Sequence, residues 1–170
     1  MSIRRIVKHG EAALKRHSAP VDYEAMRGEL PALLRDMWKT MYAARGVGLA
    51  APQIGLNLRL AVIDVKPEGR SRRLVLINPE IVKLEGELRE EEGCLSVPGV
   101  YAKVQRAARA TIRALDQKGR PYELSGEGLL ARAFQHEIDH LDGKLFIDRL
   151  AFEHKLRVLA VVRELKPTWA

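Results

Sequence analysis

The order of strand-forming and helix-forming segments constrains the fold more than any other feature of this sequence. Runs rich in Val, Ile and Leu predict strands at four places: residues 58–65, 73–78, 107–116 and 121–124, the last two joined by a hairpin turn. Helical segments flank these runs and do not alternate with them, which argues against a parallel βαβ sheet. We therefore expect an α+β fold of mostly antiparallel sheets packed around a central helix, with one helix near the N-terminus and one at the C-terminus.

Apolar residues recur at helical spacing in three segments: residues 23–44, the segment between Gly126 and Gly143, and residues 148–166. Asp22 is the predicted N-cap of the first helix, and Pro31 disturbs its beginning, so its first turn is expected nearer Glu29. The segment from Gly46 to Gly55 is predicted to be a loop, because its three glycines and one proline oppose regular helix.

The composition is that of a globular protein. The chain has 170 residues, so residues 1–170 are expected to form a single domain, and its 13 glycines and 8 prolines exclude collagen-like and low-complexity classes. No apolar run approaches the roughly 18 to 20 residues of a membrane span. Cys94 is the only cysteine and cannot form an intrachain disulfide, which is typical of a reducing compartment. We expect a cytoplasmic protein without a membrane partner.

The chain is basic, with 29 Lys and Arg against 22 Asp and Glu and a net charge of +7. Such a charge is compatible with attraction to a polyanion such as a ribosome surface, but solubility is the simpler interpretation because the basic residues are scattered along the sequence. An acidic cluster at residues 85–92 would repel a phosphate backbone close to Cys94. A nucleic acid substrate is therefore not expected, and DNA is not expected as a partner.

The predicted central helix carries the sequence His136-Glu-Ile-Asp-His140. Residues four apart lie on one face of a helix, so the two histidines can present imidazole nitrogens to one metal ion. Glu137 projects beside the same site, where its carboxylate could take a proton from a bound water. The alternative is two ordinary histidines without a metal.

A catalytic metal needs a third protein ligand, for which the sequence offers several positions. One group of metalloproteases would place a histidine at position 146, which is Phe146 here, so that group is excluded. Another group uses a downstream glutamate, and Glu164 lies at a tolerable distance. We prefer Cys94, a lone thiol in a glycine-flanked polar turn, although a free cysteine is also often a small buried core residue.

Three segments together resemble the motifs of peptide deformylases: Gly46-Val-Gly-Leu-Ala-Ala-Pro-Gln53, Glu92-Gly-Cys-Leu-Ser96 and His136-Glu-Ile-Asp-His140. They occur in the family order, and the similarity covers most of the chain. The resemblance implies a metallohydrolase that removes the N-formyl group from the initiator methionine of nascent polypeptides and releases formate. The alternatives are a zinc peptidase that uses Glu164, and a non-catalytic ribosome-binding module with a structural metal.

The resemblance also implies a role for individual residues. It makes Cys94, His136 and His140 the ligands of one divalent metal, with Fe(II) favoured, although this ligand set also suits zinc, nickel or cobalt. It makes Glu137 the general base and acid. Gln53 and the main-chain N–H of Leu95 become the donors that stabilise the oxyanion.

We expect the substrate to be bound through its main chain. Gly46 and Gly48 would let the loop backbone pair with an extended peptide as a strand does. Val47, Leu129 and Ala133 are predicted to line an apolar pocket for the methionine side chain, although core packing is an equal explanation for Leu129.

Two further sets of residues lie outside the three motifs. Arg132, Glu90 and Tyr101 depart from the residues of many deformylases, and we expect Arg132 to form a charged rim over the site, paired with Glu90. The basic residues of the last helix, such as Arg157 and Arg163, could contact the ribosome, and a solvated basic face explains them equally well.

Overall fold

The computed structural model describes residues 2–170 and contains two antiparallel sheets. The larger sheet has the strand order β1 (Gly48–Ala50), β2 (Leu60–Ile63), β3 (Leu74–Glu85), β6 (Arg109–Leu115) and β7 (Pro121–Glu127). Strands β4 (Leu88–Cys94) and β5 (Val97–Arg106) form a separate hairpin.

The α-helices are α1 (Tyr23–Met26), α2 (Leu30–Ala43), α3 (Gly128–Leu141) and α4 (Phe152–Leu165). Short 3-10 turns complete the fold: η1 (Ala12–Lys15), η2 (Ala51–Ile54), η3 (Pro67–Gly69), η4 (Phe146–Arg149) and η5 (Lys166–Thr168). The predicted α+β class is confirmed.

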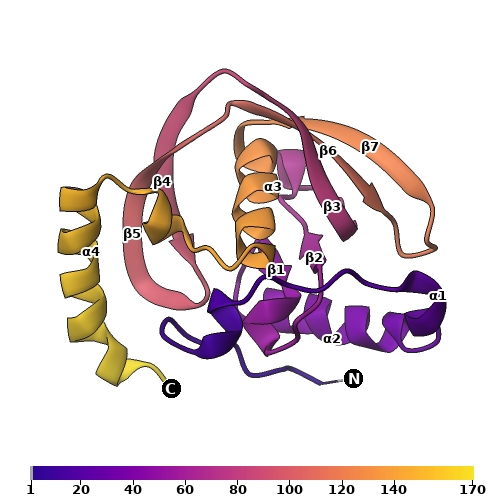
Figure 1. Cartoon of the computed structure of the whole chain (residues 1–170), viewed down its shortest axis with the longest axis horizontal. Coiled ribbons are helices and arrows are strands. Elements are labelled where there is room, and N and C mark those ends of the chain that lie inside the picture. Colours follow the sequence, from indigo (N-terminus) through magenta and orange to yellow (C-terminus); the bar gives the residue numbers. More distant parts are fainter. Residues whose placement is uncertain (1) are drawn as a thin grey trace.

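The larger sheet separates two hydrophobic cores, because successive side chains of a strand point to opposite faces. Leu60 and Val62 of β2 pack in the core that also contains the apolar face of α2. Ala61 and Ile63 pack in the other core, against α3. Helix α3 therefore lies on the inner face of the sheet, and Figure 1 shows it between this sheet and the β4–β5 hairpin.

A third core joins the hairpin to the C-terminal helix. Val100, Ala102 and Val104 alternate along β5 and pack with Val158 and Val162 of α4. Helix α4 consequently lies on the outside of the hairpin, away from α3 (Figure 1). No helix within residues 2–170 is long and apolar enough to cross a membrane.

The structure corrects several predicted boundaries. The first predicted helix is two helices, α1 capped by Asp22 and α2 beginning at Leu30 next to Pro31. The predicted loop from Gly46 to Gly55 contains strand β1 and turn η2, because strand pairing and a single 3-10 turn both tolerate this composition when neighbouring segments supply partners.

The β4–β5 hairpin was not predicted. Strand β4 is rich in glutamate, which has low strand propensity, so its local sequence hides the strand. Strand β4 pairs with β5, with Leu88 opposite Arg106. The main-chain hydrogen bonds of this pairing stabilise a strand that its local sequence does not favour.

Candidate active site

Helix α3 brings the two histidines of the metal motif together. Helix α3 begins at Gly128, which has a left-handed φ of 56°, and His136 and His140 lie one turn apart on the face that meets Cys94 of the β4–β5 hairpin. Their Nε2 atoms are 3.2 Å apart, and both rings are largely buried. The predicted pairing of these histidines on one helix face is therefore present.

Cys94 completes the cluster from the end of β4. The pairing of β4 with β5 is irregular between Glu92 and Cys94, and the Sγ atom of Cys94 lies 3.3 Å from His140 Nε2 of α3. The three ligand atoms of Cys94, His136 and His140 all lie within 4.8 Å of one another. Glu164 is exposed on α4 and does not belong to this cluster.

The chemistry of these donors fits a divalent cation. His136 donates its Nδ1 hydrogen to Glu92 Oε2 at 3.1 Å, which turns its Nε2 atom toward the sulfur and the other imidazole as the nitrogen that can bind a metal. One thiol sulfur and two imidazole nitrogens at these distances form the kind of donor set that coordinates a divalent cation. Within residues 2–170 the cluster has three members, the number of protein ligands that is typical of catalytic zinc-type sites.

A buried ion network supports the cluster. Arg106 binds both carboxylate oxygens of Glu92, at 2.8 and 3.0 Å, and donates to Asp139 at 2.6 Å, and Arg149 also pairs with Asp139. Burial by itself would raise the pKa of Glu92, but hydrogen bonds from His136 and Arg106 lower it to about 2. Glu92 is therefore held as a carboxylate that orients the ring of His136.

Glu137 of α3 packs against strand β1. Its carboxylate lies against Gly48, where a Cβ atom would be 2.9 Å from Glu137 Cδ. The side chain is 4% exposed, and within residues 2–170 its Oε2 atom has no hydrogen-bond partner. Burial raises the pKa of Glu137 to about 7, in spite of an opposing effect from His136. Such a carboxylate can both accept and return a proton near neutral pH.

The predicted oxyanion donors lie on the other side of the cluster. Gln53 is 2% exposed, accepts from the Ala50 N–H at 2.9 Å, and donates to Ser96 Oγ at 3.1 Å and Cys94 Sγ at 3.6 Å. Leu95 lies in the turn between β4 and β5. Val7 N–H donates to the Gln53 carbonyl at 2.8 Å, so the N-terminal segment braces this loop, a contact that the sequence did not predict.

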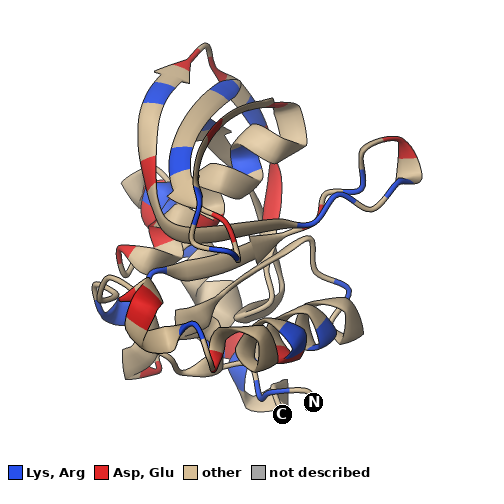
Figure 2. Cartoon of the chain, turned by 90° about the vertical axis from the view of Figure 1, so that its right-hand side faces the viewer, with Lys and Arg blue, Asp and Glu red and all other residues tan. Residues whose placement is uncertain are grey.

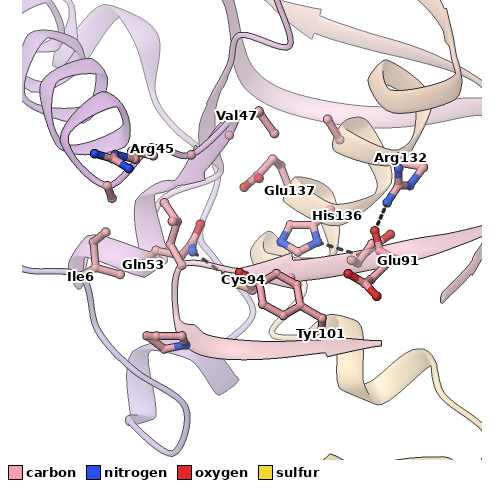
Figure 3. Close-up of a pocket in the computed structure, with 18 of the residues that line it drawn as sticks. Ile6, Arg45, Val47, Gln53, Glu91, Cys94, Tyr101, Arg132, His136 and Glu137 are labelled. Atoms are coloured by element: carbon pink, nitrogen blue, oxygen red, sulfur yellow. Dashed lines mark hydrogen bonds and ion pairs between the residues drawn. The ribbon is translucent and has the colours of Figure 1, made fainter. Parts of the chain in front are cut away.

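These residues surround one cavity of about 650 Å³ (Figure 3). Its lining includes the residues predicted to bind or act on the substrate: Gly46, Val47, Gly48, Gln53, Cys94, Leu95, Leu129, Ala133, His136 and Glu137. Val47 and Leu129 are 44% and 45% exposed, whereas Ala133 is buried. The two larger apolar side chains are therefore available to a ligand.

The prediction for Arg132 is wrong in one respect. Arg132 lines the cavity as expected, but it donates to the main-chain carbonyl of Glu91 (Figure 3). Within residues 2–170 it forms no ion pair with Glu90. Tyr101 also lines the cavity, with its ring against Gly93.

The comparisons with known proteins agree with this geometry. The sequence matches the family described as Polypeptide deformylase over residues 3–155. A peptide deformylase of Acidobacterium capsulatum is 49% identical over 167 residues, which cover 98% of this chain and 97% of that protein. This chain belongs to the peptide deformylase family.

Solved peptide deformylases have the same fold. The structure from Legionella pneumophila has a TM-score of 0.90 and 47% identity, and covers 98% of this chain and 96% of its own. The structure from Synechococcus elongatus, in complex with actinonin, has a TM-score of 0.86 and 41% identity over 97% of this chain and 88% of its own. The family implies one catalytic metal, and in this deformylase the residues that fit it are the cysteine and the two histidines.

Sequence reasoning missed Arg106, which joins Glu92 to Asp139 in the buried ion network of this deformylase. Arg106 is 5% exposed and continues the inward-facing alternation of β5 after Val100, Ala102 and Val104. An arginine at an inward position of an apolar strand face is a signal of a buried ion pair, since an unpaired charge is too costly there. Its partners come from β4 and α3, which the sequence does not place beside it.

Proposed function

We propose that this chain removes the N-formyl group from the formyl-methionine of nascent polypeptides and releases formate. The observation that carries the proposal is the convergence of Cys94, His136 and His140 beside the buried carboxylate of Glu137, at the wall of an open cavity. Family membership supports the same reaction.

The substrate would bind along strand β1. Among the described residues 2–170 this strand is at the edge of the larger sheet and pairs only with β2, so its other edge can accept an extended peptide. Gly46 and Gly48 allow the close approach of that backbone. Val47, Leu129 and Ala133 would hold the methionine side chain, and recognition through main-chain atoms would accept any downstream sequence.

Cys94, His136 and His140 would hold the metal, which when bound supplies a Lewis acid that polarises the formyl carbonyl and activates water. Glu137 would take the proton of the attacking water and deliver it to the leaving amine, because its carboxylate is within the cavity and anchored on α3. The Gln53 amide and the Leu95 N–H would donate to the oxygen that develops negative charge.

The decisive experiment is formate release from a formyl-Met peptide by the wild type and by Glu137→Gln, with metal content measured in parallel. Loss of the proton-transfer group should lower kcat by about 10²- to 10⁴-fold while metal is retained. The exposed Glu164→Gln variant is the matched control. A Glu137→Gln enzyme with wild-type turnover would contradict the proposal and favour a structural metal.

Metal content also separates the two candidates for the third ligand. We expect Cys94→Ala to lose the metal and Glu164→Ala to keep it, since only the cysteine is within the cluster. The opposite result would favour a zinc peptidase.

We propose Fe(II) as the metal. A thiolate-ligated ferrous site is oxidised in air, so the iron form should lose activity faster than the nickel or zinc form. Equal persistence of all three forms in air would count against iron.

We also propose that residues 1–170 act as one catalytic domain in the cytoplasm, where formylated chains are made. A contact of α4 with the ribosome stays a prediction. This helix exposes Arg157 and Arg163, but Glu153 and Glu164 are exposed on the same helix and dilute its positive charge.

A further inference from the structure

Arg45 has a backbone conformation that normally requires glycine. It follows the C-terminal end of α2, where its N–H donates to the Tyr42 carbonyl at 3.0 Å and the N–H of Gly46 donates to the Met41 carbonyl at 2.9 Å. These two bonds form a Schellman motif, in which the left-handed residue is usually glycine. Arg45 adopts this conformation with a φ of 59°, which is strained for a residue with a Cβ atom. Strain of this kind is concentrated at functional sites.

The strained residue belongs to the wall of the cavity. Within residues 2–170 four residues other than glycine have a left-handed φ, and Arg45 is the one of them that lines the cavity. Figure 3 shows Arg45 at one end of the cavity, Glu137 in the middle, and Arg132 with Glu91 at the other end. Arg45 is therefore placed to contact a bound ligand.

The charge of Arg45 has no partner in the protein. The described lining of the cavity contains three basic residues, Lys8, Arg45 and Arg132. Lys8 donates to the Ile6 carbonyl at 2.7 Å, and Arg132 donates to the Glu91 carbonyl. Arg45 is exposed, and within residues 2–170 its guanidinium forms neither a hydrogen bond nor an ion pair. Its charge is available to an anion.

The acidic residues of the lining do not neutralise Arg45. Glu91 lies at the opposite end of the cavity (Figure 3). Glu92 is bound by Arg106, and Glu137 is buried on α3. The end of the cavity that contains Arg45 therefore has a local positive charge.

The site gives a bound peptide a direction along β1. The formyl group must lie beside Glu137, whose carboxylate contacts Gly48. From Gly48 the chain leads back through Val47 and Gly46 to Arg45, a run of three residues that spans about 10 Å in extended conformation. An extended substrate covers the same distance between its formyl group and its third residue. The residues that follow the methionine would thus pass Arg45.

We propose that Arg45 determines specificity by binding an acidic side chain at the second or third residue of the formylated chain. The proposal rests on the proposed function, since that reaction fixes the position of the formyl group. A carboxylate can accept two parallel hydrogen bonds from a guanidinium, whereas a basic side chain at the same place would be repelled. Main-chain recognition accepts every sequence, and Arg45 makes acidic ones better substrates.

The net charge of the whole protein could also favour acidic peptides, and the test must separate the two effects. The chain has a net charge of +7, and Figure 2 shows Lys and Arg on several helices and strands of one face, with Asp and Glu among them. The matched control is Arg157→Gln, which removes one exposed positive charge on α4 from a residue that is not in the described lining.

The experiment measures formate release from two sets of formyl-Met peptides, which carry Glu, Gln or Lys at the second or at the third residue. All peptides are amidated at the C-terminus, so that no terminal carboxylate can bind Arg45. The wild type is compared with Arg45→Gly, which suits the left-handed turn, with Arg45→Lys, which keeps the charge, and with Arg157→Gln. Binding of the same peptides, labelled with fluorescein, to Glu137→Gln gives the ratios of Kd without turnover.

We expect the wild type at low salt to have a kcat/KM about threefold higher for the Glu peptide than for the Gln peptide, and about threefold lower for the Lys peptide, in at least one set. The difference should lie in KM, because Arg45 is remote from the reacting bond. It should disappear at about 1 M salt. Arg45→Gly should treat the three peptides equally, with an unfolding midpoint at or above that of the wild type, because glycine adopts this φ without strain. Arg45→Lys and Arg157→Gln should keep the preference.

Four results would overturn the inference. Equal kcat/KM and equal Kd for the three peptides in both sets would show that no acidic side chain is bound. A preference that survives in Arg45→Gly would place the acidic side chain on another residue. Equal losses in Arg45→Gly and Arg157→Gln would mean that only net charge matters. A lower unfolding midpoint with poorer turnover of every peptide in Arg45→Gly would leave Arg45 a purely structural role. Absence of turnover on all peptides would instead contradict the proposed reaction, and the Kd ratios would still test Arg45.

Discussion

Replacing Gly48 by alanine should disable the site through Glu137 while leaving the metal ligands in place. The added Cβ would lie 2.9 Å from Glu137 Cδ and closer still to Oε1, whereas carbon atoms make optimal contact at about 3.5 to 4.0 Å. The carboxylate would therefore have to retreat by about 0.6 to 1.1 Å. Strand β1 cannot retreat instead, because Gly48 is paired with Ile63 of β2.

The expected cost follows from this displacement. A misplacement of about 1 Å in an active site can cost about a hundredfold in rate, which corresponds to about 2.7 kcal/mol. The added Cβ meets the end of a side chain and not backbone, and within residues 2–170 no hydrogen bond holds Glu137 Oε2, so the fold should absorb the change. We therefore expect Gly48→Ala to lose about a hundredfold in kcat with a near-normal unfolding midpoint.

The assay is formate release at saturating formyl-Met peptide, with metal content measured on the same sample. Gly28→Ala is the matched control, because a Cβ at Gly28 meets nothing within 4 Å. Wild-type turnover in Gly48→Ala would refute the reasoning, since Glu137 would then not need its present position. Loss of metal together with activity would refute it too, because the damage would have reached the ligands.

Three other changes test separate parts of the structure. Arg106→Met leaves Glu92 and Asp139 without their buried partner and should cost about 3 to 5 kcal/mol in urea unfolding, whereas the half-exposed Arg149→Met should cost clearly less. Burial would raise the pKa of Asp64, but hydrogen bonds lower it to about 2. The ionised carboxylate therefore stabilises the folded state above about pH 4, and this stabilisation is lost as pH falls. Between pH 5 and pH 3 the unfolding free energy of the wild type should fall by about 1 kcal/mol more than that of Asp64→Asn. Gln53→Ala should raise the activation free energy by about 2.7 to 4 kcal/mol, which lowers turnover, and should keep its metal. Unchanged turnover would mean that Gln53 serves only to stabilise its loop through hydrogen bonds.

Contacts within one helix or one short loop follow from the sequence alone. The spacing of His136 and His140 predicts that they share a face, because helical geometry is local and repeats every turn. Asp22 is likewise predictable as a cap, since its acceptor satisfies an N–H only three positions away. The fold class follows from the order of such segments.

The tertiary structure decided everything that joins distant segments. Cys94 reaches His140 across 46 positions, and only the packing of the β4–β5 hairpin against α3 selects it over Glu164 as the third member of the cluster. The same packing gives Arg106 its partners Glu92 on β4 and Asp139 on α3. Local periodicity carries no information about these distances, because they depend on how whole elements bury their apolar faces against one another.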